Sequence, residues 1–219
     1  MNEQVFEKVD DYINGLFFDN DPALTYATEN IIKNGIEDAS ISPVQGQLLQ
    51  VFAKACNARK ILEVGTLGGY STIWLAKALP DDGKVITIEY DAFHAQVAKQ
   101  NIDHAQLGKK VEIKVGKALD ILPTLGTEAP FDLIFIDADK PPYTEYFQLA
   151  LTLSRKGTII ICDNVIRNGK VLDEQSTDEK VKGVQRLNTF LSTCKEVKAT
   201  ILQTVGSKEY DGMVIAIVQ

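Results

Sequence analysis

Hydrophobic positions in the first part of the chain recur at the spacing of amphipathic helices. In residues 2–18 the apolar side chains fall three and four positions apart, which predicts a helix. A second helix is expected from Pro22 toward Gly35, because proline is favoured in the first turn of a helix, and a third is expected over about 44–57. Together these segments predict a helical extension over residues 1–57.

From residue 58 onward the pattern changes to short, nearly continuous apolar runs that alternate with amphipathic stretches. Such runs are typical of parallel strands buried on both faces, and their alternation with helices predicts a doubly wound α/β sheet. The last two runs are joined by a loop too short for a helical crossover, so they are expected to pair as an antiparallel hairpin. Strands are predicted at residues 61–64, 84–89, 111–115, 131–137, 156–162, 196–203 and 211–218, with helices at 70–79 and 91–106.

Length and composition fit one domain of this kind. The chain has 219 residues, of which 45% are hydrophobic and 24% charged, close to the average for globular proteins. We therefore expect a single domain over residues 1–219, with its α/β core at 58–219. No apolar run is long enough to span a bilayer, and the N-terminus lacks the basic start and apolar stretch of a signal peptide. The cytoplasm is the expected location.

Charge, cysteine and histidine content limit the chemistry further. A net charge of −7 disfavours broad binding to nucleic acid, which depends on neutralising phosphates. Three widely spaced cysteines form neither a disulfide framework nor a zinc pattern, and Cys56 and Cys162 are interpreted as core residues. The chain has only two histidines, which disfavours a histidine-rich metal site or a serine–histidine–aspartate triad. His94 and His104 are interpreted as lying on the solvated face of a polar helix.

The first predicted strand leads into a glycine-rich turn at residues 63–71, where an α/β sheet binds its ligand. The next strand ends in Glu89, whose carboxylate could accept hydrogen bonds from both hydroxyls of a ribose. Leu67 stands where the dinucleotide fingerprint requires glycine, and Glu63 would repel a pyrophosphate. The pattern therefore favours a cationic nucleoside without phosphate, such as S-adenosylmethionine, over NAD. A turn needed only for packing remains the alternative.

Oxygen-bearing side chains follow two later strands. Asp137 comes directly after the fourth predicted strand, and Asp163 and Asn164 follow the fifth. Two carboxylates and an amide would offer hard oxygen ligands, which suit Mg²⁺, Ca²⁺ or Mn²⁺. The coordination positions left open could hold a water and two vicinal oxygens of a substrate. The alternative is that these residues cap helices or turns, as Asp and Asn often do.

Taken together, these motifs resemble the cation-dependent O-methyltransferases, which include plant caffeoyl-coenzyme A enzymes, animal catechol O-methyltransferase and small bacterial relatives. The resemblance is carried by residues 63–71, 137–140, 163–164 with 168–169, and 211–213, and it runs from about Ser40 to the C-terminus. It implies a Rossmann-like class I methyltransferase fold, with a seven-stranded, mostly parallel sheet, a C-terminal antiparallel strand and helices on both faces. It also implies a small bacterial-type member that forms a homodimer.

The resemblance implies a role for each matching residue. Lys140 is expected to be the general base. The metal is expected to bind Asp137, Asp163 and Asn164. The methyl donor is expected to contact Ile41, Glu63, Gly65, Ser71, Glu89, Ala118, Asp137, Asp139 and Tyr146. The chain departs from the plant pattern at Val44–Gln47, which lacks an acidic pair, and at Arg167, which replaces a bulky aromatic, so the acceptor stays open.

The predicted reaction is methyl transfer from S-adenosylmethionine to a hydroxyl of a small catechol-like phenol, with a divalent metal chelating adjacent substrate oxygens. A methyltransferase acting on a hydroxylated base in tRNA is the main alternative; a basic patch at 109–110 or 155–156 would support it. A nicotinamide-dependent oxidoreductase and a donor-binding module without chemistry are the others. No membrane partner is expected. The N-terminal aromatics, Phe6, Phe17 and Phe18, could belong to a dimer interface or to the core.

Overall fold

A central sheet with helices on both faces organises the chain, which a computed structural model describes over residues 3–18, 20–208 and 210–219. The strands are β1 (Lys60–Val64), β2 (Lys84–Glu89), β3 (Val111–Val115), β4 (Phe131–Ile136), β5 (Ser154–Cys162), β6 (Val197–Thr204) and β7 (Asp211–Val218). The α-helices are α1 (Glu3–Phe17), α2 (Pro22–Lys33), α3 (Pro43–Ala55), α4 (Tyr70–Ala78), α5 (Ala92–His104), α6 (Ala118–Ile121), α7 (Tyr143–Thr152) and α8 (Glu179–Thr193). Short 3₁₀ helices are η1 (Leu122–Thr127) and η2 (Lys170–Leu172).

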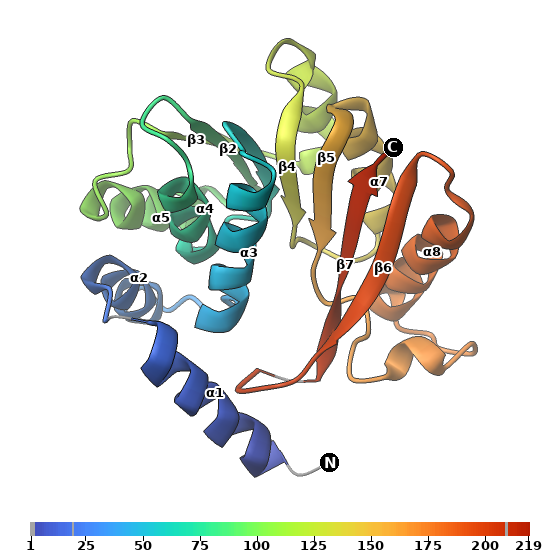
Figure 1. Cartoon of the computed structure of the whole chain (residues 1–219), viewed down its shortest axis with the longest axis horizontal. Coiled ribbons are helices and arrows are strands. Elements are labelled where there is room, and N and C mark those ends of the chain that lie inside the picture. Colours follow the sequence, from blue (N-terminus) through green and yellow to red (C-terminus); the bar gives the residue numbers. More distant parts are fainter. Residues whose placement is uncertain (1–2, 19, 209) are drawn as a thin grey trace.

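The sheet has seven strands in the order β3-β2-β1-β4-β5-β7-β6 (Figure 1). Strands β1 to β5 are parallel to one another, whereas β7 runs antiparallel to both of its neighbours. This arrangement confirms the predicted fold class, with a C-terminal antiparallel strand in a mostly parallel sheet. The strand order reverses between β1 and β4, and such a reversal is where open α/β sheets form a ligand crevice.

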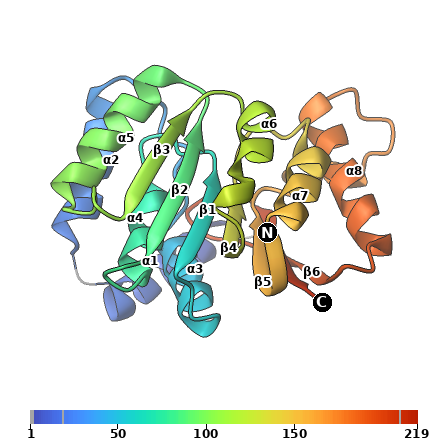
Figure 2. The ribbon, with the colours of Figure 1, turned by 90° about the horizontal axis from the view of Figure 1, so that it is seen from above.

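Two helical layers cover the two faces of the sheet, with α2 to α5 on one side and α6 to α8 on the other (Figure 2). Successive residues of β1 show why both faces are apolar: Ile61 packs in the first layer and Leu62 in the second, and both are fully buried. Burial on both sides explains the continuous apolar runs in the sequence. Helices α2 and α3 share the first core with the sheet. The single domain over residues 1–219 stays a prediction.

The bounds of the predicted elements agree with the structure to within a few residues, but the helices of the second layer were not assigned from sequence. Their signals are present: α7 buries Tyr143, Tyr146, Phe147 and Ala150 at helical spacing. The prediction that Cys162 is a core residue is confirmed, since it is fully buried, whereas Cys56 is only half-buried.

The N-terminal helix α1 lies against the tip of the β6–β7 hairpin (Figure 1). The carboxylate of Asp10 accepts a hydrogen bond from the backbone N–H of Ser207 at 2.7 Å. Of the three N-terminal aromatics, Phe18 packs edge-on against Trp74, Phe17 is exposed and Phe6 is half-buried. Among the described residues, no helix is both long and apolar enough to cross a membrane.

Candidate active site

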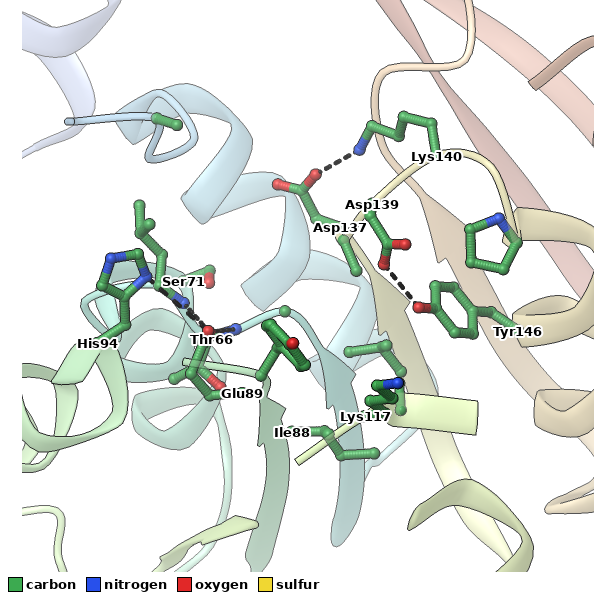
Figure 3. Close-up of a pocket in the computed structure, with 18 of the residues that line it drawn as sticks. Thr66, Ser71, Ile88, Glu89, His94, Lys117, Asp137, Asp139, Lys140 and Tyr146 are labelled. Carbon is green, nitrogen blue, oxygen red and sulfur yellow. Dashed lines mark hydrogen bonds and ion pairs between the residues drawn. The ribbon is translucent and has the colours of Figure 1, made fainter. Parts of the chain in front are cut away.

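A cavity of about 700 Å³ opens at the carboxyl ends of β1 to β5 (Figure 3). The predicted site residues that line it are Ile41, Gly65, Ser71, Glu89, Ala118, Asp137, Asp139, Lys140, Tyr146 and Asn164. Glu63 and Asp163 do not line it; both lie behind its wall, nearly inaccessible to solvent. The structure therefore gathers the predicted residues around one space, with these two acids beneath its surface.

The turn after β1 forms one wall of the cavity and requires glycine at its first position. Gly65 has a φ of 99°, and a Cβ placed there would lie 2.0 Å from the carbonyl oxygen of Asp137. Any side chain would force the ends of β1 and β4 apart. Leu67, at the position where a dinucleotide site has glycine, also adopts a left-handed φ of 49°. Its backbone is held there by hydrogen bonds from neighbouring elements.

Glu89 is the first of these supports. One oxygen of its carboxylate, Oε2, accepts the backbone N–H groups of Thr66 at 3.1 Å and Leu67 at 2.8 Å. The other oxygen, Oε1, accepts the N–H of Asp91 at 2.9 Å. The acid at the end of β2 thus fixes the glycine turn from inside the cavity, a role that the sequence did not suggest.

Asn101 supports the same turn from behind. Its side-chain amide donates to the carbonyl of Gly68 at 2.8 Å and accepts from the amide of Asn30 at 2.8 Å. Asn101 is fully buried and Asn30 nearly so, so these bonds are shielded from water. A chain of polar contacts therefore joins helix α2, helix α5 and the turn.

Glu63 is a buried acid surrounded by hydroxyl groups. It accepts hydrogen bonds from Ser71 at 2.6 Å, Thr72 at 2.5 Å and Thr87 at 2.6 Å. Burial raises the pKa of Glu63 to about 7, and the three hydroxyls oppose that rise by stabilising the ionised form. Since Ser71 lines the cavity and Glu63 does not, Glu63 can influence a ligand through the orientation of the Ser71 hydroxyl.

The opposite wall is built by the loop after β4 and by α7 (Figure 3). Asp139 accepts a hydrogen bond from the hydroxyl of Tyr146 at 2.6 Å, which fixes both side chains at the cavity surface. Ile41 closes the cavity from the segment before α3. The helix start behind it is fixed by a capping box, in which the Ser42 backbone N–H donates to the Gln45 side chain at 2.8 Å.

Lys140 is buried between two partners. Its Nζ donates to Oδ1 of Asp137 at 2.8 Å and to the hydroxyl of Tyr143 at 2.5 Å. The fully buried Tyr143 donates in turn to the carbonyl oxygen of Asp163 at 3.0 Å. Sequence reasoning missed Tyr143, the first residue of α7, because Lys140 lies in the loop before this helix and no helical spacing relates the two.

Asp163 and Asn164 occupy the end of β5. Burial, followed by the nearby charge of Asp137, raises the pKa of Asp163 to about 7, while Lys140 lowers it. The Asp163 carboxylate accepts the N–H of Asn164 at 2.8 Å and lies 3.5 Å from the amide nitrogen of Gln45. Asn164 adopts a left-handed φ of 59° and lines the cavity.

This donor set fits a divalent cation bound by hard oxygen ligands. Two carboxylates lie close enough to repel each other, with one lysine as their shared positive partner. The side-chain amide of Asn164 has no hydrogen bond within the described residues. No group of three His, Cys, Asp or Glu side chains able to hold a metal occurs in that part of the chain, so a metal site here depends on this amide as its third ligand.

His94 is a cavity residue that the sequence reading placed wrongly. It was interpreted as part of a solvated helix face, yet it lines the cavity with its Nδ1 at 3.9 Å from Oε1 of Glu89 (Figure 3). Its position near the start of α5, directly after β2, is the signal that could have identified it. His104, at the other end of α5, is exposed and stacks on Tyr26 with ring centroids 3.7 Å apart.

A mostly parallel sheet whose strand ends carry a glycine turn and an acid after β2 defines the class of Rossmann-like methyltransferases. The chain belongs to the O-methyltransferase family, whose model matches residues 18–217.

Several relatives cover the whole chain. It is 58% identical over 221 residues to a catechol O-methyltransferase of Niastella koreensis, covering 100% of both chains. It is similar to the solved O-methyltransferase of Bacillus cereus in complex with S-adenosylhomocysteine (SAH), with 44% identity, 99% of both chains covered and a TM-score of 0.96. The O-methyltransferase TomG of Streptomyces achromogenes, solved with S-adenosylmethionine, gives 44% identity, 100% and 99% coverage and a TM-score of 0.96.

Proposed function

We propose that the protein transfers the methyl group of S-adenosylmethionine to a hydroxyl of a small catechol-like phenol, with a divalent cation bound beside the acceptor. The observation that carries this proposal is one cavity lined by the glycine turn, Asp137, Asn164 and the buried Lys140, with Asp163 directly behind its wall. The solved relatives that contain S-adenosylmethionine or SAH support the donor. The catechol O-methyltransferase of Niastella koreensis supports the acceptor class.

The donor lies along the wall formed by the ends of β1, β2 and β3, and its amino-acid end reaches the loop after β4 and helix α7. Glu89 faces its ribose, Ala118 its adenine, and Asp139 and Tyr146 its amino-acid end. The acids suit a ligand that carries an ammonium and a sulfonium but no phosphate. Leu67 disfavours a dinucleotide, since a pyrophosphate needs the bare backbone of a glycine at that position of the turn.

Asp137, Asp163 and Asn164 would hold the cation. When bound, it would supply positive charge beside two vicinal oxygens of a catechol and so favour loss of a hydroxyl proton. Asp137 would then have two neighbours of positive charge, since it also accepts a hydrogen bond from Lys140 at 2.8 Å. Asn164, at the cavity surface, would turn its amide oxygen toward the cation.

Lys140 is the buried amine that can hold or move a proton next to the acceptor. Its Nζ is fixed by hydrogen bonds to Asp137 and Tyr143. The residue lines the cavity between the donor wall, at the ends of β1 to β3, and the proposed metal wall, at the ends of β4 and β5. In the proposed step the acceptor oxygen forms a bond to the methyl carbon while the carbon–sulfur bond breaks. The sulfur keeps that electron pair. Lys140 first releases one of its own protons to solvent and, as the neutral amine, then takes the hydroxyl proton. Alignment of the two reactants would supply much of the rate enhancement.

Methylation of tRNA is the weaker alternative because one residue of each candidate basic patch is already paired with an acid. Lys110 lies 3.5 Å from a carboxylate oxygen of Asp81. Arg155 pairs with Asp132 at 2.6 Å. Paired charges of this kind contribute less to phosphate binding, and the net charge of −7 opposes it further.

A homodimer is part of the proposal. Helix α1 exposes the apolar residues Val9, Tyr12 and Leu16, and the edge strand β6 exposes Ile201 and Leu202. The Asp10–Ser207 hydrogen bond joins α1 to the hairpin, so these surfaces belong to neighbouring elements. A second copy of the chain would cover this surface. Light scattering of the wild type and a Leu16→Glu variant tests it, and a monomeric wild type would contradict it. The cytoplasmic location stays a prediction.

The deciding experiment measures methyl transfer to a panel of catechols with Mg²⁺, with EDTA, and after Mg²⁺ is restored. Activity that is lost on chelation and regained with Mg²⁺ supports the reaction and the cation together. Activity that persists in EDTA contradicts the metal part of the proposal. Tight binding of S-adenosylmethionine with no turnover of any catechol would support the proposed donor. It would indicate that the acceptor is RNA or another hydroxylated compound.

A further inference from the structure

The carboxylate of Glu89 has little remaining capacity for a ligand. An ionised carboxylate offers about four lone-pair sites, and the N–H groups of Thr66, Leu67 and Asp91 occupy three of them. Glu89 can therefore accept from one further hydroxyl at full strength. A ribose presents two vicinal hydroxyls, so the second needs another partner in the cavity.

His94 is the polar side chain placed beside that open site. Its Nδ1 lies 3.9 Å from Oε1 of Glu89, which is too far for a direct hydrogen bond. That gap lets a hydroxyl lie within hydrogen-bonding distance of both atoms. The His94 side chain is 31% exposed and lines the same cavity as Glu89. An imidazole can donate through one ring nitrogen or accept through the other, so it can pair with a hydroxyl in either sense.

We propose that His94 is a further donor-binding residue that hydrogen-bonds one ribose hydroxyl while Glu89 accepts from the other. The proposal rests on the proposed function only in taking an adenosyl compound as the ligand of this cavity. It assigns to His94 a contribution to donor affinity that is specific to a ribose hydroxyl and separate from the metal wall.

Binding of SAH and of its 2′-deoxy and 3′-deoxy analogues, measured by calorimetry without metal, tests this assignment. The variants are His94→Phe, which keeps a ring but removes the hydrogen bond, and His94→Gln, which keeps a donor and an acceptor. His104→Phe is the matched control, because it changes the other histidine, at the far end of the same helix. Tyr90→Phe tests the second polar side chain that lines this part of the cavity.

His94→Phe is expected to weaken SAH binding about three- to tenfold, the usual effect of losing one neutral hydrogen bond. His94→Gln should recover part of that loss, and His104→Phe and Tyr90→Phe should bind like the wild type. With the analogue that lacks the hydroxyl facing His94, the wild type and His94→Phe should bind within about twofold of each other.

Equal losses with both deoxy analogues, or SAH binding by His94→Phe within about twofold of the wild type, would overturn the proposal. So would a loss that occurs in Tyr90→Phe and not in His94→Phe. If the wild type binds no SAH, the cavity does not hold an adenosyl donor, and the proposed function is contradicted. The two failures are therefore distinguishable in one set of titrations.

Discussion

The donor wall of the cavity, at the ends of β1 to β3, and the proposed metal wall, at the ends of β4 and β5, each have a buried acid behind the surface. The two acids have different surroundings. On the donor wall, Glu63 accepts hydrogen bonds from three hydroxyls. On the metal wall, Asp163 faces a second carboxylate, Asp137, and the two share Lys140. Burial raises the pKa of both Glu63 and Asp163 to about 7, but only Asp163 has the charge of a neighbouring acid as the next largest cause.

The difference shows which wall is complete without a ligand. The chain itself supplies hydrogen-bond donors for Glu63 and Glu89, so the donor wall is preorganised by its own residues. The metal wall keeps like charges together with a single positive partner, an arrangement that a divalent cation would stabilise. Substitutions in the donor wall should therefore change SAH binding but not Mg²⁺ binding. Substitutions in the proposed metal wall should change Mg²⁺ binding but not SAH binding.

The largest effect is expected from Asp163→Asn. The variant keeps the size of the side chain but removes a carboxylate from the metal wall, so catechol methylation in Mg²⁺ should fall by roughly a thousandfold or more. SAH binding should stay within about twofold of the wild type, because the donor wall is unchanged. Initial rates and calorimetry measure the two quantities on the same preparations.

The matched control is Asp103→Asn, which removes an exposed acid that pairs with Lys99 on α5. It should keep wild-type activity. Without metal, Asp163→Asn should be at least as stable as the wild type, because the folded protein raises the pKa of Asp163 above its ordinary 3.8. If Asp163→Asn methylates catechol at the wild-type rate, Asp163 is not a ligand of the catalytic metal.

The second effect concerns the pH dependence of stability and Glu63→Gln. The pKa of Glu63 rises from 4.5 to about 7 on folding, so the folded state holds this proton more tightly than the unfolded state. Stability should therefore fall as pH rises from about 4.5 to 7 and then level off, by roughly 3 kcal/mol from this group. Glu63→Gln cannot ionise, so its contribution to this fall should vanish.

Urea unfolding at several pH values between 5 and 8 measures the difference between wild type and variant. Subtracting the two curves removes the contribution of Asp163, whose pKa shift has the same sign. Thr124→Val, which changes an exposed hydroxyl in η1, should leave the pH dependence as in the wild type. Parallel curves for wild type and Glu63→Gln would show that Glu63 is ionised across the range.

The sequence predicted the fold better than it predicted the roles of site residues. Continuous apolar runs located the strands because both faces of the sheet are buried, and the short loop before β7 predicted its antiparallel pairing. The predicted acids also lie at strand ends. Their hydrogen bonds could not be foreseen, since Glu89 reaches backbone groups of the turn and Glu63 reaches side chains from two other elements.

Residues that act through tertiary packing were the ones missed. Asn101 lies in the last turn of α5, where its type and spacing resemble an ordinary polar helix position. Only the fold places it behind the turn and opposite Asn30. His94 was misread for the same reason: one helix carries a cavity-facing residue at its start and an exposed one at its end. Helical periodicity separates buried from exposed faces but does not identify a face that lines a cavity.

The third effect tests whether the donor wall depends on this buried support. Asn101→Ala leaves the carbonyl of Gly68 without its side-chain donor and removes one of the two acceptors of the Asn30 amide, so unfolding stability should fall by about 2 kcal/mol. Because the turn loses its rear hydrogen bond, SAH binding should weaken several-fold while Mg²⁺ binding to the apo-protein does not change. Gln96→Ala, which changes an exposed residue of the same helix, is the control. A loss of metal affinity equal to the loss of SAH affinity would mean that the two walls are not independent.

The smallest expected effect compares the two ligands directly by thermal unfolding. Mg²⁺ at about ten times its Kd should stabilise the wild type by about 1.4 kcal/mol, a rise of roughly 3–6 °C in Tm for a chain of this size. Asp163→Asn should show little of this rise, because its metal wall has lost a charged ligand. SAH without metal should raise the Tm of wild type and variant equally. If Mg²⁺ stabilised both proteins alike, the cation would bind elsewhere, and the contrast between a complete donor wall and a cation-requiring metal wall would fail.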